Sequence, residues 1–309
     1  MYSRLPSRRA FLQTLAAGAA ASAVPGRLHA QTPSLTTTAL TDTIHVVAGD
    51  GGNIGAVRGP DGLLLIDGGF ANQTADLQHF LIEKVDARKV QILFDTHWHG
   101  DHVGSNVSLG GNGARIIAQT ETRKWLTQKV NMEIFHRTVD PLDPSGIPGE
   151  VFDQGGMLNF GNERIQYRHV PFAHTSGDVY FFFRHANILQ TGDLFFNGMY
   201  PVIDYSTGGW IGGMAHALDV LVKVGNKETR IVPGHGPIGT KDDMRAAQDM
   251  LHTLASRLDG FASRGASLEE VVAAKPTADF DAHFGQGFLK PEAFLAMAYP
   301  SIARHNKKG

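Results

Sequence analysis

The stretch Thr-His-Trp-His-Gly-Asp-His, residues 96–102, holds three histidines and one aspartate within six positions. The apolar run Val-Gln-Ile-Leu-Phe, residues 90–94, stands just before it and predicts a short strand buried on both faces. Coordinating side chains therefore gather where a buried strand ends. This placement favours a functional site over the alternative, a polar loop in which histidines occur by chance.

The chemistry of these side chains favours a metal site. His97 and His99 are two residues apart, so an extended backbone points both to one side. Gly100 permits a sharp turn that returns Asp101 and His102 toward the same point. Imidazole suits zinc, and a carboxylate adds a harder ligand. Because four ligands are more than one catalytic zinc usually takes from a loop, the stretch predicts two metal ions.

Three further segments place a coordinating side chain beside glycine at the end of an apolar run. His174, Asp193 and His235 each follow a predicted strand. One such histidine alone is more often structural, but together with residues 96–102 the three predict ligands contributed by several strand ends. The chain contains no cysteine, so a transition metal must be held by nitrogen and oxygen atoms.

The pattern of the 309 residues, of which 42% are hydrophobic, predicts a globular fold with a sizeable core. Strand patterns occur in two groups, each followed by helical patterns, which predicts two sheets covered by helices on their outer faces. Helices are expected at residues 121–135, 208–224, 241–261, 268–274 and 291–305. Residues 137–156 are rich in Pro, Gly and Asp and are expected to form a loop.

The first thirty residues predict an export signal. Arg8 and Arg9 precede an Ala-rich, mildly apolar run, no acidic residue occurs before Asp42, and residues 28–30, Leu-His-Ala, offer a cleavage site. The paired arginines resemble the twin-arginine type, and the apolar run is too short to remain as a membrane anchor. We therefore expect twin-arginine export machinery as a partner, cleavage near Ala30 and a periplasmic protein. A disordered or amphipathic N-terminus is the alternative.

The charge balance bears on the partner. Removal of that signal takes four of the 28 basic residues and no acidic residue, which leaves 24 basic against 30 acidic residues and a net charge of about −6. An acidic chain argues against a nucleic-acid partner, because phosphate binding requires a basic surface. A small-molecule substrate is therefore expected.

These motifs carry a resemblance to a known family. Thr-His-x-His-x-Asp-His, followed by His174, Asp193 and Gly-His235-Gly, resembles the metallo-β-lactamase-fold superfamily of metallohydrolases, and Ile66-Asp67-Gly68-Gly69 is similar to its early strand-and-turn element. The resemblance implies a four-layer αβ/βα sandwich of two mixed β-sheets with helices on the outer faces. With the signal at 1–30 and a polar linker at 31–42 predicted from composition, the expected organisation adds a metallo-β-lactamase-like domain at 43–262 and a C-terminal helical extension at 263–309.

The resemblance also implies a role for each ligand position. One ion would be held by His97, His99 and His174, and the other by Asp101, His102 and His235. Asp193 would bridge the two ions. Asp67 would orient the loop and its ligands, unless it is a turn or helix-cap residue. The expected cofactor is two zinc ions per chain, with iron or manganese as possible replacements.

The residue at position 193 helps to identify the branch of the family that this sequence resembles. Class B β-lactamases typically have Cys or Ser where this chain has Asp193, whereas glyoxalase II-like thioesterases and lactonases have Asp. Flavodiiron proteins tend to have Glu at the position of His99, and persulfide dioxygenases use fewer ligands on one iron. A glutathione-binding segment should be rich in basic residues, whereas the short tail from residue 268 has only Lys275, Lys290 and Arg304 before the terminal lysines. The sequence is therefore most similar to exported glyoxalase II-like hydrolases.

These features predict a dinuclear zinc hydrolase that uses a metal-bound hydroxide to cleave an ester, thioester, lactone or amide-like bond. Asp101 is the candidate to orient the nucleophile or take its proton. The alternatives are β-lactamase activity, an iron-dependent persulfide-dioxygenase-like enzyme, and a non-catalytic metal-binding protein. Residues 195–205 are expected to form a wall of the substrate pocket or to pack in the core. Residues 137–156 are a second candidate for the rim of that pocket. Trp98 is expected to face either the substrate or the core.

Overall fold

The computed structural model describes residues 35–85 and 89–306. The predicted signal at 1–30 and the beginning of the predicted linker lie outside these residues. Within the described part of the chain, no helix is both long enough and apolar enough to cross a bilayer.

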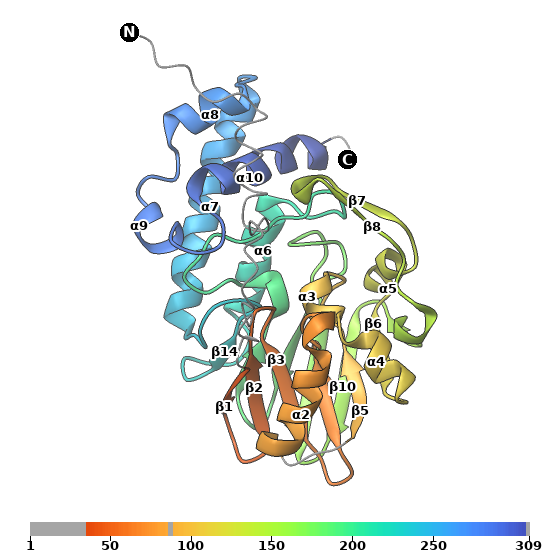
Figure 1. Ribbon diagram of the computed structural model, residues 1–309. Helices are drawn as coiled ribbons and strands as arrows, with labels where there is room; N and C mark the ends of the chain where they lie inside the picture. The colour runs from red at the N-terminus through yellow and green to blue at the C-terminus, as the bar shows by residue number, and fades with distance from the viewer. Residues whose placement is uncertain (1–34, 86–88, 307–309) are drawn as a thin grey trace, which may run out of the picture. The chain divides into compact units, whose positions relative to one another are not determined.

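The first sheet has seven strands in the order β1-β2-β3-β4-β5-β6-β9 (Figure 1). They are β1 (Thr36–Ala39), β2 (Ile44–Ala48), β3 (Ile54–Arg58), β4 (Leu63–Ile66), β5 (Val90–Phe94), β6 (Arg115–Gln119) and β9 (Glu150–Phe152). Neighbours from β1 to β4 are antiparallel, and those from β4 to β9 are parallel. Residues 36–39, which we expected in a linker, instead pair with β2, because their β-branched threonines suit an edge strand.

The second sheet has five strands in the order β10-β11-β12-β13-β14. They are β10 (Gly155–Phe160), β11 (Glu163–His169), β12 (Val179–Phe183), β13 (Ile188–Gln190) and β14 (Arg230–Val232). All neighbours are antiparallel except β13 and β14, which are parallel. Two mixed sheets are thus present, as the sequence predicted.

The core explains why the central strands are continuously apolar. On β4, Leu64 and Ile66 pack between the two sheets against Phe181 of β12, whereas Leu63 and Leu65 point to the opposite face. That second face is covered by α2 (Thr74–Val85) and α4 (Asn106–Gly111). Successive side chains of a strand alternate between faces, so a strand buried on both faces must be apolar throughout.

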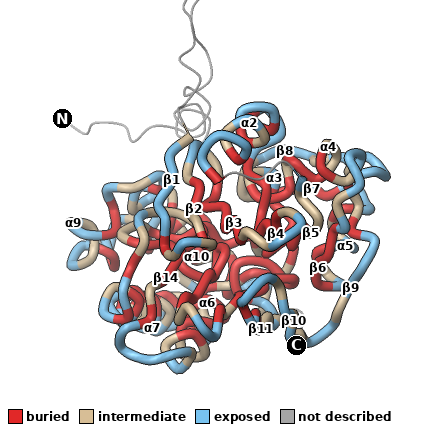
Figure 2. Tube along the Cα trace, turned by 90° about the horizontal axis from the view of Figure 1, so that it is seen from below, coloured by how far each residue is buried: buried red, intermediate tan, exposed pale blue. Residues whose placement is uncertain are grey.

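Helices cover the outer face of the second sheet. Leu189 and Ile231 of that sheet pack against α6 (Ile211–Leu221), α7 (Lys241–Ser263) and α10 (Pro291–Asn306). Figure 2 shows the strands mostly buried and the exposed segments on the outer helices and turns. The arrangement of helices, sheet, sheet and helices confirms the predicted αβ/βα sandwich. Two shorter helices, α8 (Leu268–Ala274) and α9 (Asp281–Phe284), connect α7 to α10.

One predicted helix and one predicted loop are wrong in part. The helix expected at residues 121–135 is only α5 (Thr120–Leu126). Beyond it, β7 (Val130–Met132) and β8 (Arg137–Val139) form a two-stranded hairpin, and β9 also lies within the expected loop. Pairing between strands is non-local, so the sequence of this segment did not indicate it.

Candidate metal centre

Seven coordinating side chains from separate parts of the chain meet beyond the carboxyl ends of strands from both sheets. His97, His99, Asp101 and His102 follow β5 in the first sheet, and His174, Asp193 and His235 follow β11, β13 and β14 in the second. The structure therefore brings together all seven residues that the sequence singled out, and arranges them as two groups.

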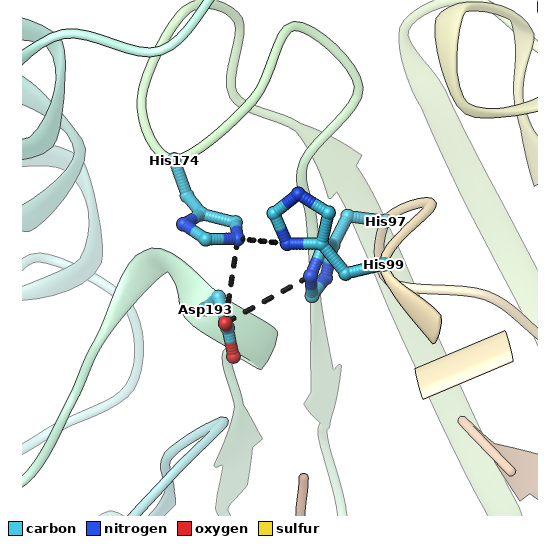
Figure 3. Close-up of side chains that lie close together, drawn as sticks. All are labelled: His97, His99, His174 and Asp193. Carbon is cyan, nitrogen blue, oxygen red and sulfur yellow. Dashed lines mark hydrogen bonds and ion pairs between the residues drawn. The ribbon is translucent and has the colours of Figure 1, made fainter. Parts of the chain in front are cut away.

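The first group comprises His97, His99, His174 and Asp193, with potential ligand atoms within 4.8 Å of one another (Figure 3). Nε2 of His174 lies 2.8 Å from Nδ1 of His99 and 3.4 Å from Oδ2 of Asp193. Nε2 of His97 lies 3.8 Å from the same oxygen. All four side chains are buried. Three imidazole nitrogens and one carboxylate oxygen make a four-ligand set that suits zinc.

The second group comprises Asp101, His102 and His235. Oδ2 of Asp101 lies 3.2 Å from Nε2 of His235 and 3.6 Å from Nε2 of His102. The side chain of His102 is fully buried, whereas those of Asp101 and His235 are 23% and 24% exposed. This group is therefore the more accessible of the two to solvent.

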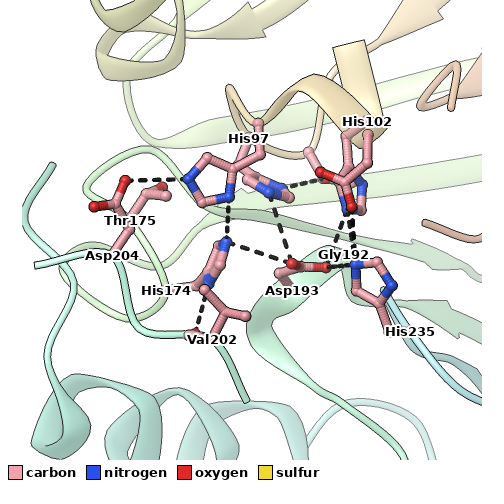
Figure 4. A network of polar contacts seen from close by, with 12 residues as sticks. His97, His102, His174, Thr175, Gly192, Asp193, Val202, Asp204 and His235 are labelled. Atoms are coloured by element: carbon pink, nitrogen blue, oxygen red, sulfur yellow. Dashed lines mark hydrogen bonds and ion pairs between the residues drawn. The ribbon is translucent and has the colours of Figure 1, made fainter. Parts of the chain in front are cut away.

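Asp193 lies between the two groups and faces both (Figure 4). Its Oδ2 faces His97 and His174, while its Oδ1 lies 3.2 Å from Nε2 of His102 and 3.4 Å from Nε2 of His235. Each oxygen of one carboxylate is thus directed at a different set of imidazoles, which is the geometry of a bridging ligand.

The protons on the ring nitrogens fit metal binding. Nδ1 of His174 donates to the carbonyl oxygen of Val202, at 2.8 Å, and Nδ1 of His102 lies 2.8 Å from Oδ2 of Asp67. In a neutral imidazole, a ring nitrogen that donates in this way leaves the other nitrogen with a lone pair for a cation. Moreover, Nε2 of His97 is buried without a hydrogen-bond partner among the described residues, a cost that a cation would remove.

The two groups differ in proton content. Burial lowers the pKa of His97 and lowers the pKa of His174 to about 4, so both are neutral at pH 7. Burial alone would also lower the pKa of His235, but Asp193 and Asp101 raise it to about 9. The pKa of His102 is raised in the same way, because Asp193 and Asp101 outweigh its burial. The second group must therefore release protons before it can bind a cation.

A family model covers the part of the chain that carries the seven ligands. The model described as the metallo-beta-lactamase superfamily covers residues 47–239, a range that includes all seven side chains. The chain belongs to the metallo-beta-lactamase superfamily. It is a metal-dependent hydrolase of that superfamily, with a centre built from histidine and aspartate.

Individual relatives of the superfamily are distant. The chain is 25% identical over 174 residues to hydroxyacylglutathione hydrolase GloC of Haemophilus influenzae, covering 56% of this chain and 80% of the relative. It is 22% identical over 190 residues to metallo-beta-lactamase type 2 of Bacillus sp. (strain 170), covering 62% and 68%. The solved metallo-beta-lactamase from Pontibacter korlensis aligns with a TM-score of 0.58 at 19% identity, over 71% of this chain and 99% of that one. This structural likeness supports the fold.

Asp67 is tied to the superfamily motif rather than to a helix end. Its Oδ1 accepts from the backbone N–H of Thr96 at 2.8 Å, and its Oδ2 accepts from the Thr96 hydroxyl at 2.9 Å and contacts His102. The carboxylate is fully buried, and the residue has a φ of 67°, in the left-handed region that few residues other than Gly adopt. Asp67 therefore holds the start of the ligand loop and orients His102.

Asp204 plays the corresponding part for His99, and the sequence did not indicate it. Its Oδ2 lies 3.1 Å from Nε2 of His99 and accepts from the Thr207 hydroxyl at 2.7 Å, while its Oδ1 accepts from the backbone N–H of Ser206. The buried carboxylate fixes the His99 ring with Nδ1 toward the metal site. The available signal was the Asp-x-Ser spacing, which is typical of an Asx-turn.

Gly234 and Asn53 position His235. A Cβ atom at Gly234 would lie 2.0 Å from Oδ1 of Asp193, so only glycine allows β14 to end this close to the bridging carboxylate. The side-chain amide of Asn53 donates to the carbonyl oxygens of Pro233 and Gly236, at 2.9 and 3.0 Å. Asn53, in the loop between β2 and β3 of the first sheet, thereby holds the segment that carries His235 after β14 of the second sheet.

A cavity of about 470 Å³ is lined by residues of both metal groups and by a mainly apolar wall. Phe196 and Tyr200 line it, whereas Phe195 packs in the core, so residues 195–205 serve both as pocket wall and as packing cluster. Of the predicted rim at residues 137–156, Arg137 lines the cavity. Trp98 is buried in a separate core and donates to the Thr207 hydroxyl, so it faces the core.

Proposed function

We propose that this chain is a dinuclear zinc hydrolase that cleaves an ester, thioester, lactone or amide-like bond of a small molecule. The position of Asp193 carries the proposal, because its two oxygens face separate histidine sets. His97, His99 and His174 would complete one metal site, and Asp101, His102 and His235 the other. Two zinc ions so held supply an activated water molecule and a Lewis acid for the carbonyl group.

Asp101 is the residue to which we assign a catalytic role. Its side chain is 23% exposed and lines the cavity, whereas that of Asp193 is only 4% exposed. Burial alone would raise the pKa of Asp101, but His102 and His235 outweigh it and lower the pKa. An ionised carboxylate that reaches the cavity can orient the attacking water and hold its proton.

β-Lactamase activity is a second candidate, supported by the similarity to metallo-beta-lactamase type 2 of Bacillus sp.. The aspartate at position 193 weighs against it, since class B β-lactamases typically have Cys or Ser there. Iron-dependent dioxygenation and metal binding without turnover remain alternatives. The thiolate-free set of five imidazoles and two carboxylates suits zinc and also admits iron or manganese.

The decisive experiment combines metal analysis with a substrate panel. Protein purified without added metal is analysed for zinc, iron and manganese, then assayed on thioesters, lactones, β-lactams and phosphoesters. We expect about two zinc ions per chain and turnover of thioesters or lactones. Asp193→Ala should lose both metal and turnover. One iron per chain would favour the dioxygenase, and two metals without any turnover would favour a binding protein.

We also propose that the chain is exported by the twin-arginine machinery, is cleaved near Ala30 and acts in the periplasm on a small molecule, without a nucleic-acid partner or a lasting membrane anchor. Arg8 and Arg9 before the Ala-rich run support this. Replacing both arginines by lysine should retain the uncleaved chain in the cytoplasm. Equal periplasmic yields of both forms would rule out this route.

A further inference from the structure

The wall of the cavity is apolar and is built from separate segments of the chain. Phe70 precedes α2, Met132 and Phe135 belong to the β7–β8 hairpin, Phe196 follows Asp193, and Phe288 precedes α10. The last is 73% exposed and Phe70 is 37% exposed, although large apolar side chains are normally buried. Exposed aromatic groups beside a cavity are typical of a surface that binds an apolar ligand.

Arg137 is the only Arg or Lys among the described residues that line this cavity. Its side chain forms no ion pair or hydrogen bond within the described part of the chain, and its guanidinium lies 5.5 Å from the centre of the Phe135 ring. Arg304, by contrast, is neutralised by an ion pair with Glu133. Asp50, on the β2–β3 loop, is an exposed carboxylate elsewhere in the lining. The guanidinium is therefore free to accept an anion.

The hairpin that carries Arg137 is held in place. The backbone N–H of Glu133 donates to the Ser206 hydroxyl at 3.0 Å, in the loop that contains Asp204. The ion pair of Glu133 with Arg304 fastens the hairpin to α10, and Met132 pairs with Arg137 across the two strands. Anchoring at both positions fixes the backbone of Arg137 relative to the loop that orients His99. The backbone of Arg137 therefore has a defined position at the edge of the cavity.

We propose that the substrate of this site is an apolar molecule with one anionic group, and that Arg137 binds this group while the aromatic wall binds the apolar body. This inference rests on the proposed function and adds the substrate class. Guanidinium presents paired N–H groups that match a carboxylate or sulfonate, and stacking on an aromatic ring pre-organises it. Arg137 is then a specificity-determining residue that acts away from the reacting bond.

Two fluorescent probes with the same aromatic body test the binding step on the metal-loaded protein. 1-Anilinonaphthalene-8-sulfonate carries an anion, and N-phenyl-1-naphthylamine is neutral. Arg137→Gln should raise the Kd of the anionic probe about tenfold, the loss of one charge-assisted contact, and leave that of the neutral probe unchanged. Arg123→Gln, an exposed arginine that does not line the cavity, is the matched control and should change neither. Equal changes for both probes, or none for the anionic one, would overturn the assignment.

Phe288→Ala tests the apolar wall separately. This substitution should raise the Kd of both probes, because both carry the same naphthyl body. Unaltered binding of both would overturn the role of the wall.

A matched pair of esters then links binding to turnover. The 4-nitrophenyl half-ester of octanedioic acid has a free carboxylate, and its methyl ester is neutral. Arg137→Gln should lower kcat/KM about tenfold for the first ester only, and Arg137→Lys should restore part of it. If the wild type hydrolyses both esters equally and the variant does not discriminate, the inference fails while the proposed hydrolase stands. If the wild type hydrolyses neither, the proposed function fails, and the probe titrations decide whether Arg137 binds an apolar anion.

Discussion

Metal loading of this hydrolase should be linked to protons at one site far more than at the other. At pH 7, His97 and His174 are neutral in the metal-free protein, the latter with a pKa of about 4, so a cation entering the first group displaces no proton from them. His235 has a pKa of about 9 and the pKa of His102 is raised, so both are protonated. A cation entering the second group must displace these protons.

The sign and size of the effect follow from this difference. His235 gains its extra proton below its raised pKa of about 9, so a falling pH favours the metal-free form of the second group. Each displaced proton weakens binding about tenfold per pH unit. Between pH 8 and pH 6 the second ion should therefore bind about a hundredfold more weakly for the proton of His235 alone, and more weakly still where His102 also releases a proton. The positive charge of the first ion lowers the pKa of His235 and brings the result toward the smaller figure.

Calorimetric titration with zinc at pH 7, in two buffers of different ionisation enthalpy, counts the protons released by each ion. We expect the weaker-binding ion to release one to two protons and the tighter one to release fewer. Asp67→Asn removes one of the charges that raise the pKa of His102, so the second ion should release fewer protons. Because the substitution also removes the carboxylate that orients the His102 ring, the second ion should bind about 10 to 100 times more weakly. Equal proton release by both ions, or a second affinity that is constant from pH 6 to pH 8, would refute the reasoning.

Other variants test individual contacts. Asp193→Asn should reduce both metal contents, whereas Asp101→Asn should reduce only the second, as metal analysis after dialysis will show; equal losses in both variants would contradict the bridging position. Asp204→Asn should weaken the tighter site about 10 to 100 times in a chelator competition, and an unchanged affinity would remove its orienting role. Lys241→Met leaves the last carbonyl groups of α6 without their ammonium partner, so the free energy of unfolding should fall by about 1–3 kcal/mol in urea titrations with kcat unchanged. A fall in kcat alone would argue against this structural role.

The sequence predicted the two sheets well because the relevant patterns are local. A strand buried on both faces is continuously apolar, as Leu63–Ile66 shows, and such a run can be read without knowledge of its partners. The helix expected at residues 121–135 failed for the opposite reason. Val130 and Met132 are two residues apart, as in a strand, but three residues are too short a run to predict one, and their pairing with β8 is a property of the fold. Thr36–Ala39 became an edge strand for the same reason.

The candidate ligands were predictable because they lie in short glycine-containing segments that follow apolar strands. The residues that orient them were harder to find. Asp204 and Asn53 lie in irregular loops without periodicity, and each acts on a histidine that is remote in the sequence. Arg137 was equally hard to find, since its place beside the metal centre depends on a hairpin that was not predicted from the sequence. A local signal can mark a turn, as the Asp-x-Ser spacing does at Asp204, but it does not show which distant loop the side chain contacts.

The position of the centre has a consequence for stability. His97 and His99 come from the first sheet, and His174 and His235 come from the second, so neither sheet alone holds the full set for either ion. Unfolding, or separation of the sheets, therefore removes part of the ligand set of each ion. A ligand that binds only the folded state stabilises it by about 4 kcal/mol when its concentration is about a thousand times its Kd. The chain has no cysteine and so cannot form a disulfide between the sheets. Metal coordination would link them instead, with Asp193 as the residue common to both ions.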